Sequence, residues 1–78
     1  MVTVLTTPNC VQCDATKRTL DRKGIPYEVI PVGDTGEGRE IANRLGAMSA
    51  PVVILENGDW WAGYRPDRIS AIQVPVAV

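Results

Sequence analysis

Residues 8–13 read Pro-Asn-Cys-Val-Gln-Cys and contain the only two cysteines of this 78-residue chain, Cys10 and Cys13. An apolar, β-branched run at residues 2–6 precedes them, and good helix formers follow at residues 15–23. A strand that leads directly into a C-x-x-C pair at the start of a helix is typical of a dithiol redox site. This stretch therefore predicts both the fold and the chemistry of the chain.

The expected positions of the two cysteines on the helix predict different roles for them. Backbone N–H groups in the first turn of a helix lack intrahelical partners and carry a positive partial charge, which stabilises a thiolate. Residues three apart share a helical face, so the Cα separation of about 5.5 Å that a disulfide requires is within reach. Cys10, at or just before the first turn, is predicted to be the exposed nucleophile, and Cys13 the resolving thiol.

Three other uses of a cysteine pair fit this chain less well. A zinc site needs about four ligands, and the sequence offers two cysteines and no histidine. An iron–sulfur centre shared between two chains meets the same shortage of ligands. A structural disulfide would close a very short loop, which limits its entropic gain, and small disulfide-stapled domains normally contain more cysteines. We therefore favour the redox interpretation and expect no metal.

Composition and charge argue against several classes of function. The 78 residues, 45% of them hydrophobic, suffice for one domain with a single small core. Eight basic and nine acidic residues give a net charge of −1, so no electrostatic attraction to nucleic acid is expected. The N-terminus lacks the pattern of a signal peptide, and no apolar run approaches the roughly 18 residues of a membrane helix. Together with the C-x-x-C pair, these features predict a cytoplasmic protein.

Apolar periodicity and turn residues predict seven elements in one compact unit. Strand patterns occupy residues 2–6, 27–32, 52–55 and 60–63. Helix signals occupy residues 11–23, residues 37–45 and a short segment that begins near Pro66. The order β-α-β-α-β-β-α, with a four-stranded mixed sheet and three helices, is the minimal thioredoxin fold of the α/β class. We expect residues 1–78 to form a single domain and residues 73–78 to be a flexible tail.

Several local features refine this prediction. The first helix is expected to connect two parallel strands, and Pro31 places the second of these strands at an edge of the sheet. Asp34 or Thr35 is predicted to cap the second helix. The Asn-Gly pair at residues 57–58 predicts a two-residue type I′ turn between the last two strands.

With the motifs described, the chain resembles the NrdH-redoxins of the glutaredoxin/thioredoxin superfamily from residue 2 to about residue 72. Residues 10–13 match the C-V-Q-C of that group, and residues 49–53 match its segment with a cis-proline. Residues 61–67, W-A-G-Y-R-P-D, are similar to its W-S-G-F-R-P-[DE] stretch. The group's serine and phenylalanine are replaced by Ala62 and Tyr64. Thr7 stands where the group often has lysine, which favours a slightly less acidic Cys10 thiol.

The resemblance implies a function as an electron carrier. NrdH-redoxins receive electrons from NADPH through thioredoxin reductase and pass them to the large subunit of a class Ib ribonucleotide reductase. The resemblance implies a monomer that binds no NADPH or flavin itself, and the sequence has no G-x-G-x-x-G motif. In the expected mechanism, Cys10 attacks a partner disulfide, and Cys13 then resolves the mixed disulfide.

Residues around the two cysteines are predicted to contact partner proteins. A cis bond between Ala50 and Pro51 would present the backbone of Ala50 beside Cys10, where a partner segment could pair with it. Trp60 and Trp61 should point to opposite faces of their strand, one toward the core or the last helix and the other outward. The predicted partner-binding residues are Val11, Gln12, Ala50, Pro51, Trp60, Trp61 and Arg65.

Two alternative functions remain open at this point. A glutaredoxin would take electrons from glutathione or mycothiol, but the acidic pair that glutaredoxins place after a Gly-Gly turn is replaced here by Tyr64 and Arg65. At least one of Arg65 and Arg68 is expected to pair with a carboxylate such as Glu40. The dithiol could instead serve a redox-sensing or iron–sulfur binding module.

Overall fold

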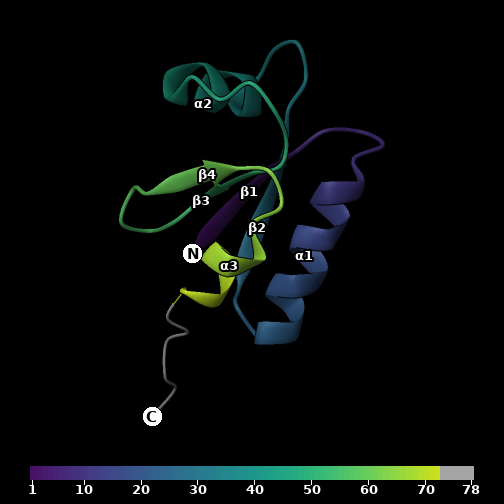
Figure 1. The fold of residues 1–78 in the computed structure, drawn as a ribbon. Helices are drawn as coiled ribbons and strands as arrows, with labels where there is room; N and C mark the ends of the chain where they lie inside the picture. Colours follow the sequence, from purple (N-terminus) through teal and green to yellow (C-terminus); the bar gives the residue numbers. More distant parts are fainter. Residues whose placement is uncertain (73–78) are drawn as a thin grey trace.

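The computed structural model describes residues 1–72, and its elements follow the predicted order (Figure 1). The strands are β1 (Val2–Thr6), β2 (Tyr27–Pro31), β3 (Val52–Ile54) and β4 (Trp60–Ala62). The helices are α1 (Val11–Lys23), α2 (Glu37–Leu45) and α3 (Pro66–Ser70). The prediction for residues 73–78 lies outside the described residues.

The four strands form one mixed sheet in the order β2-β1-β3-β4. Strand β1 pairs in parallel with β2, with Val4 opposite Val29, and pairs antiparallel with β3, with Val4 opposite Val53. Strands β3 and β4 are antiparallel, with Val53 opposite Trp61. The predicted thioredoxin fold is confirmed, as are the parallel pairing of β1 with β2 and the edge position of β2.

Alternate side chains of the central strands point to opposite faces of the sheet. Each face packs against helices and is buried in its own hydrophobic cluster. One hydrophobic cluster contains Val4 and Val53 together with Leu20 of α1 and Ile69 of α3. The other contains their strand neighbours Leu5 and Val52 together with Ala42 of α2. Helices α1 and α3 therefore cover one face of the sheet and α2 covers the other, as the ribbon shows (Figure 1).

Helix α1 begins directly at the cysteine pair. Cys10 is its N-cap residue in an extended conformation, and Gly24 ends the helix in the left-handed conformation, with φ of 72°. Cys13, Thr16 and Leu20 form its buried side, at near-helical spacing. The buried hydroxyl of Thr16 donates a hydrogen bond to the carbonyl oxygen of Gln12 at 2.8 Å. The predicted bounds and core face of this helix are confirmed.

Two local predictions are wrong. Neither Asp34 nor Thr35 caps α2, because the helix begins after Gly36, whose φ is 99°, without a side-chain cap. The hairpin between β3 and β4 has a three-residue loop at residues 56–58. The N–H of Leu55 donates to the C=O of Asp59, and the C=O of Leu55 accepts from the N–H of Gly58. A type I′ turn would need positive φ at two residues, but only Gly58 has it within this loop, with φ of 95°.

No helix within residues 1–72 is both long enough and apolar enough to cross a membrane. This result covers the described part of the chain.

Candidate active site

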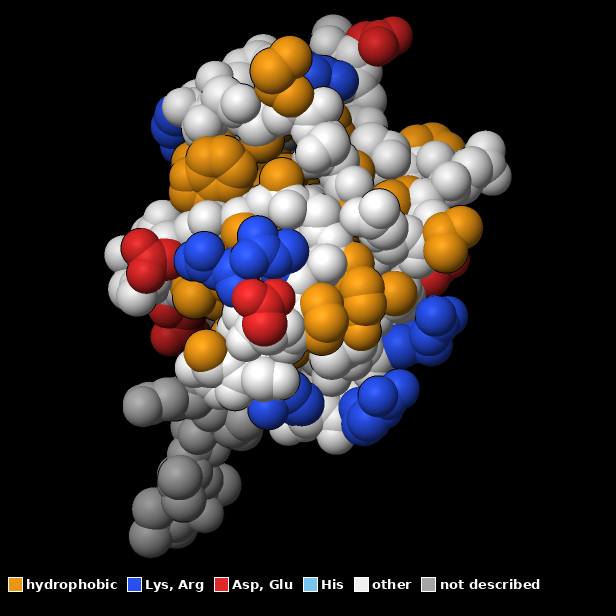
Figure 2. All heavy atoms as spheres, viewed as in Figure 1, with side chains coloured by type: hydrophobic (Ala, Val, Ile, Leu, Met, Phe, Trp, Pro, Cys, Tyr) orange, Lys and Arg blue, Asp and Glu red, His pale blue; other side chains and the backbone are white. Residues whose placement is uncertain are grey.

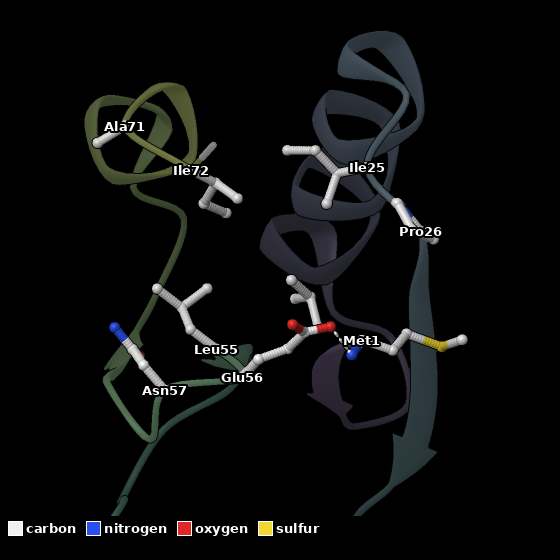
Figure 3. A pocket seen from close by; sticks show the side chains of 9 residues that line it. Met1, Ile25, Pro26, Leu55, Glu56, Asn57, Ala71 and Ile72 are labelled. Carbon is white, nitrogen blue, oxygen red and sulfur yellow. Dashed lines mark hydrogen bonds and ion pairs between the residues drawn. The ribbon is translucent and has the colours of Figure 1, made fainter. Parts of the chain in front are cut away.

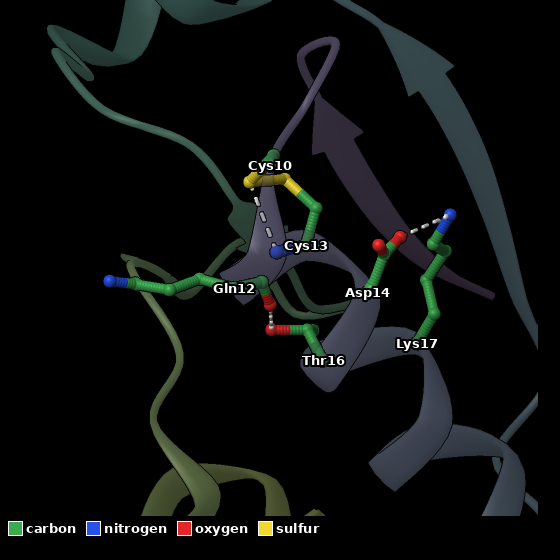
Figure 4. Close-up of polar contacts among 6 residues, drawn as sticks. All are labelled: Cys10, Gln12, Cys13, Asp14, Thr16 and Lys17. Carbon is green, nitrogen blue, oxygen red and sulfur yellow. Dashed lines mark hydrogen bonds and ion pairs between the residues drawn. A yellow bond between two sulfur atoms is a disulfide. The ribbon is translucent and has the colours of Figure 1, made fainter.

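Cys10 and Cys13 form a disulfide at the N-terminus of α1, with their Cα atoms 5.2 Å apart (Figure 4). The two residues differ in exposure: Cys10 is partly exposed, whereas Cys13 is only 2% exposed. The backbone N–H of Cys13 donates to Sγ of Cys10 at 3.0 Å. When the pair is reduced, this N–H and the positive end of the helix lie where they stabilise a thiolate on Cys10.

The immediate charge neighbours of the disulfide are a pair on the first two turns of α1. The Nζ atom of Lys17 lies 3.6 Å from a carboxylate oxygen of Asp14 (Figure 4). Asp14 is largely exposed, so solvent screens both charges and the pair contributes little to stability. Lys17 nevertheless offsets the negative charge of Asp14 near the cysteines.

The loop before β3 forms one wall of the site. The bond between Ala50 and Pro51 is cis, which confirms the prediction. The carbonyl oxygen of Pro51 accepts a hydrogen bond from the N–H of Gly63 at 2.7 Å. The cis-proline loop is thereby joined to the segment that connects β4 to α3.

Two surface grooves open beside the exposed cysteine. One, of about 450 Å³, runs along α1 and includes Val11 and Lys17 with both cysteines. The other, of about 460 Å³, lies between Cys10 and α2 and is called here the α2 groove. Its walls include Met48, Ala50 and Arg39. A partner segment that reaches Cys10 therefore finds a hollow on either side.

The side chain of Gln12 makes a hydrogen bond within the chain. Its side chain points away from the disulfide (Figure 4), and its Oε1 atom accepts a hydrogen bond from the N–H of Tyr64 at 3.1 Å. The hydroxyl of Tyr64 lies 3.0 Å from Oγ1 of Thr19, on α1. Two hydrogen bonds thus join Tyr64 to α1, a contact that the sequence did not predict. The replacement of the group's phenylalanine by a tyrosine was the one available signal, because the added hydroxyl needs a partner.

The two tryptophans lie on opposite faces of the sheet, as predicted. Trp61 is 5% exposed and packs in the cluster that contains Ile69, with the guanidinium carbon of Arg68 5.1 Å from its ring centroid. Trp60 is half-buried against the cluster on the other face. The burial of Trp61 argues against direct contact with a partner and leaves Trp60 as the tryptophan placed for it.

The two arginines of the last segment do not pair with Glu40. Arg65 instead forms an exposed ion pair with Asp67, with Nη2 and Oδ2 3.3 Å apart. The hydrogen bond from Arg65 lowers the pKa of Asp67, and the positive charge of Arg65 adds to this effect. Arg68 lies over the ring of Trp61. The expectation that one of these arginines pairs with a carboxylate is confirmed for Arg65, but its partner is Asp67 rather than Glu40, and the pair is exposed rather than buried.

Apolar side chains are exposed on both sides of Cys10. Val11 is 79% exposed and Met48 is 97% exposed, and they line different grooves. The sequence analysis did not identify Met48, because no motif distinguishes it from other loop residues. In Figure 2, apolar side chains form small groups separated by polar atoms, with basic side chains along α1 and near α3.

A further pocket lies at the opposite end of α1 (Figure 3). Ile25, Leu55 and Ile72 supply much of its apolar lining, and the N-terminal amino group pairs with Glu56 at its edge. Neither cysteine lines this pocket. It therefore lies apart from the redox pair.

Comparison with known proteins agrees with this geometry. A family model described as Glutaredoxin matches residues 2–61. The Glutaredoxin-like protein NrdH of Escherichia coli K12 is 40% identical over 72 residues, which are 91% of this chain and 86% of the relative. The Gene 56 protein of Mycobacterium phage L5 is 33% identical over 91% of this chain and 70% of its own length.

Solved structures give the same assignment. The NrdH-redoxin of E. coli, a glutaredoxin-like protein with a thioredoxin-like activity profile, superimposes with a TM-score of 0.83 at 37% identity, over 97% of each chain. A glutaredoxin from Brucella melitensis superimposes with a TM-score of 0.64 at 30% identity, over 90% of this chain and 74% of its own. The chain belongs to the glutaredoxin family and, within it, to the NrdH-redoxins, which makes it a thiol–disulfide oxidoreductase with a Cys10–Cys13 redox pair.

Proposed function

We propose that this redoxin carries electrons from NADPH, through thioredoxin reductase, to the disulfide of a class Ib ribonucleotide reductase large subunit. The observation that supports this most directly is the pair itself, a partly exposed Cys10 at a helix N-terminus beside a buried Cys13. The NrdH assignment and the thioredoxin-like activity profile of the E. coli relative support the choice of partners.

The proposed reaction moves two electrons and two protons to the partner. The Cys10 thiolate attacks one sulfur of the partner disulfide, a mixed disulfide forms, and the released partner sulfur takes up a proton. Cys13 then loses its proton and attacks Sγ of Cys10, which releases the second partner sulfur as a thiol. The redoxin is left oxidised as the Cys10–Cys13 disulfide, and thioredoxin reductase restores the dithiol with electrons from NADPH.

The same proposal includes the oligomeric state, the compartment and the cofactors of the protein. The redoxin acts as a monomer in the cytoplasm. Its reduced Cys10–Cys13 dithiol carries the two electrons, so it needs neither bound NADPH nor bound flavin. Within residues 1–72, no group of three or more histidine, cysteine, aspartate or glutamate residues could hold a metal ion.

Glutathione is a poor electron donor in this proposal, because the residues after β4 make contacts within the chain and provide no carboxylate for glutathione. The N–H of Tyr64 is hydrogen-bonded to Gln12, and Arg65 is paired with Asp67. Neither Tyr64 nor Arg65 offers a carboxylate to the γ-glutamyl amine of glutathione.

A coupled assay tests the proposal. We expect rapid NADPH oxidation when thioredoxin reductase and a disulfide substrate are supplied, and slow oxidation when glutathione and glutathione reductase replace thioredoxin reductase. Equal rates by the two routes would show a glutathione-dependent glutaredoxin instead. An iron-containing, coloured preparation would point to the iron–sulfur alternative.

A further inference from the structure

The α2 groove carries a positive charge that no acidic residue in its lining balances. Among the described residues that line the groove, Arg39 is the one with a charged side chain, and the others are apolar or neutral polar. The groove also contains Cys10 and Ala50. A segment that follows this groove away from Cys10 therefore meets a cation.

Arg39 is held in place on one side of its guanidinium group. Its Nε donates a hydrogen bond to the carbonyl oxygen of Gly33 at 2.8 Å. The salt bridges found within residues 1–72 include Lys17 with Asp14 and Arg65 with Asp67, but none involves Arg39. The side chain is half-buried, so less conformational freedom is lost when it binds a ligand.

We propose that Arg39 binds the carboxylate of an acidic side chain that flanks the target disulfide in a partner protein. A planar guanidinium group binds a carboxylate through paired hydrogen bonds, and the Nη atoms of Arg39 are its free donors. The partner segment lies in the α2 groove, with its cysteine at Cys10 and its acidic residue at Arg39. This inference rests on the proposed function in one respect, that the substrate is a protein disulfide.

Synthetic peptides with an intramolecular disulfide provide the test. Both ends are blocked, so one glutamate is the sole carboxylate, and that glutamate occupies each position beside a cysteine in turn. Each peptide has a matched glutamine version. Protein reduced beforehand with dithiothreitol is mixed with peptide in a single turnover, so the identity of the natural electron donor does not affect the result.

At one or more positions we expect the second-order rate constant for the glutamate peptide to exceed that for the glutamine peptide by about fivefold, as for a partly exposed ion pair. Raising the salt concentration to about 1 M should reduce this preference, because the ionic screening length falls to about 3 Å. A glutamate preference at no position would overturn the proposal.

Three variants assign the preference to one side chain. Arg39→Gln should remove the glutamate preference, so that the glutamate and glutamine peptides react at the same rate. Arg39→Lys should keep part of the preference, because it retains the charge but loses the paired hydrogen bonds. Arg44→Gln, on the same helix but outside the groove, should keep the full preference.

Two outcomes would refute the assignment to Arg39. One is an unchanged preference in Arg39→Gln, and the other is an equal loss in Arg44→Gln, which would indicate a general charge effect. Because the single-turnover assay requires no reductase, failure of the thioredoxin reductase assay would refute the proposed donor and leave this test valid.

Discussion

At the scale of single residues, the site depends on different surroundings for two chemically identical thiols. Sγ of Cys10 accepts the N–H of Cys13 and is reached from outside, whereas Cys13 lies on the buried side of α1. A thiolate attacks only where a partner disulfide can approach it in line, so exposure decides which cysteine begins the reaction. The buried thiol needs to reach only its neighbour.

This asymmetry predicts opposite results for two single variants. Cys10→Ser should abolish turnover, because Cys13 is too buried to attack a partner disulfide. Cys13→Ser should still form the mixed disulfide but should be unable to resolve it. Mass spectrometry of each variant after reaction with an oxidised partner should find a trapped adduct on Cys13→Ser alone. An adduct on Cys10→Ser alone would reverse the assignment of roles.

The hydrogen bond between the hydroxyls of Thr19 and Tyr64 predicts an energetic coupling between these two residues, which are 45 positions apart. Thr19→Val and Tyr64→Phe each remove one side of the hydrogen bond. The hydroxyl of Thr19 also donates to the carbonyl oxygen of Ala15, so either variant alone gives an ambiguous result. In a double-mutant cycle by denaturant unfolding, we expect a coupling of about 1 kcal/mol. Strictly additive effects would show that this hydrogen bond contributes nothing.

The sequence could predict the cysteine pair. It could not predict the hydrogen bonds between Tyr64 and α1 or the position of Arg39 in the α2 groove. C-x-x-C spacing defines the redox pair locally, since both residues belong to one helical turn. The contact between Gln12 and Tyr64 spans 52 positions. Arg39 and Cys10 line the same groove because of the way α2 packs against the sheet. No periodicity or spacing encodes such contacts, so the three-dimensional structure was needed to find them.

At the scale of elements, the predicted strands and helices were right where local signals were sufficient. Glycines ended α1 and α2 in the left-handed conformation, and Pro66 began α3. The predicted cap of α2 failed because a tertiary contact fixes where that helix lies. Gly38, in its first turn, is buried against the backbone of Pro31 at the end of β2.

Gly38→Ala tests this contact directly. A Cβ atom at residue 38 would overlap the carbonyl oxygen of Pro31, so α2 would have to move away from the sheet. We expect a loss of about 1–3 kcal/mol in the free energy of unfolding, as for other overpacked sites, despite the higher helix propensity of alanine. Asn43→Ala, at an exposed position of the same helix, should be neutral or slightly stabilising. Equal stabilisation by both changes would contradict the packing argument.

At the scale of the whole molecule, the length of α1 separates the redox pair at its N-terminus from the residues at its other end. The cysteines lie at the N-terminal end of α1, while Ile25 follows its C-terminal end and Tyr27 begins β2. The sequence predicted this arrangement because a helix that connects two parallel strands must run the full length of the sheet. Titration of a group at the far end can therefore alter stability with little effect on the reaction.

Tyr27 is such a group, and the sign of its effect on stability can be worked out. Burial raises its pKa above the ordinary value of 10.0, and a hydrogen bond to Asp21 and the charge of Asp21 raise it further. The folded protein therefore keeps the phenol proton at pH values where the unfolded chain has lost it. The resulting stabilisation is complete below the unfolded pKa of about 10 and is lost as the pH rises through the folded pKa.

Denaturant unfolding of the oxidised protein across the alkaline range measures this effect, because the disulfide keeps thiol titration out of the result. The wild type should lose stability more steeply above about pH 10 than Tyr27→Phe, which has no phenol to titrate. Asp21→Asn removes the charge that raises the pKa of Tyr27, so its curve should lie between the other two. Turnover below pH 10 should be the same in all three proteins, because the phenol is then protonated and far from Cys10. Parallel stability curves for the wild type and Tyr27→Phe would show that Tyr27 titrates alike in the folded and unfolded chains.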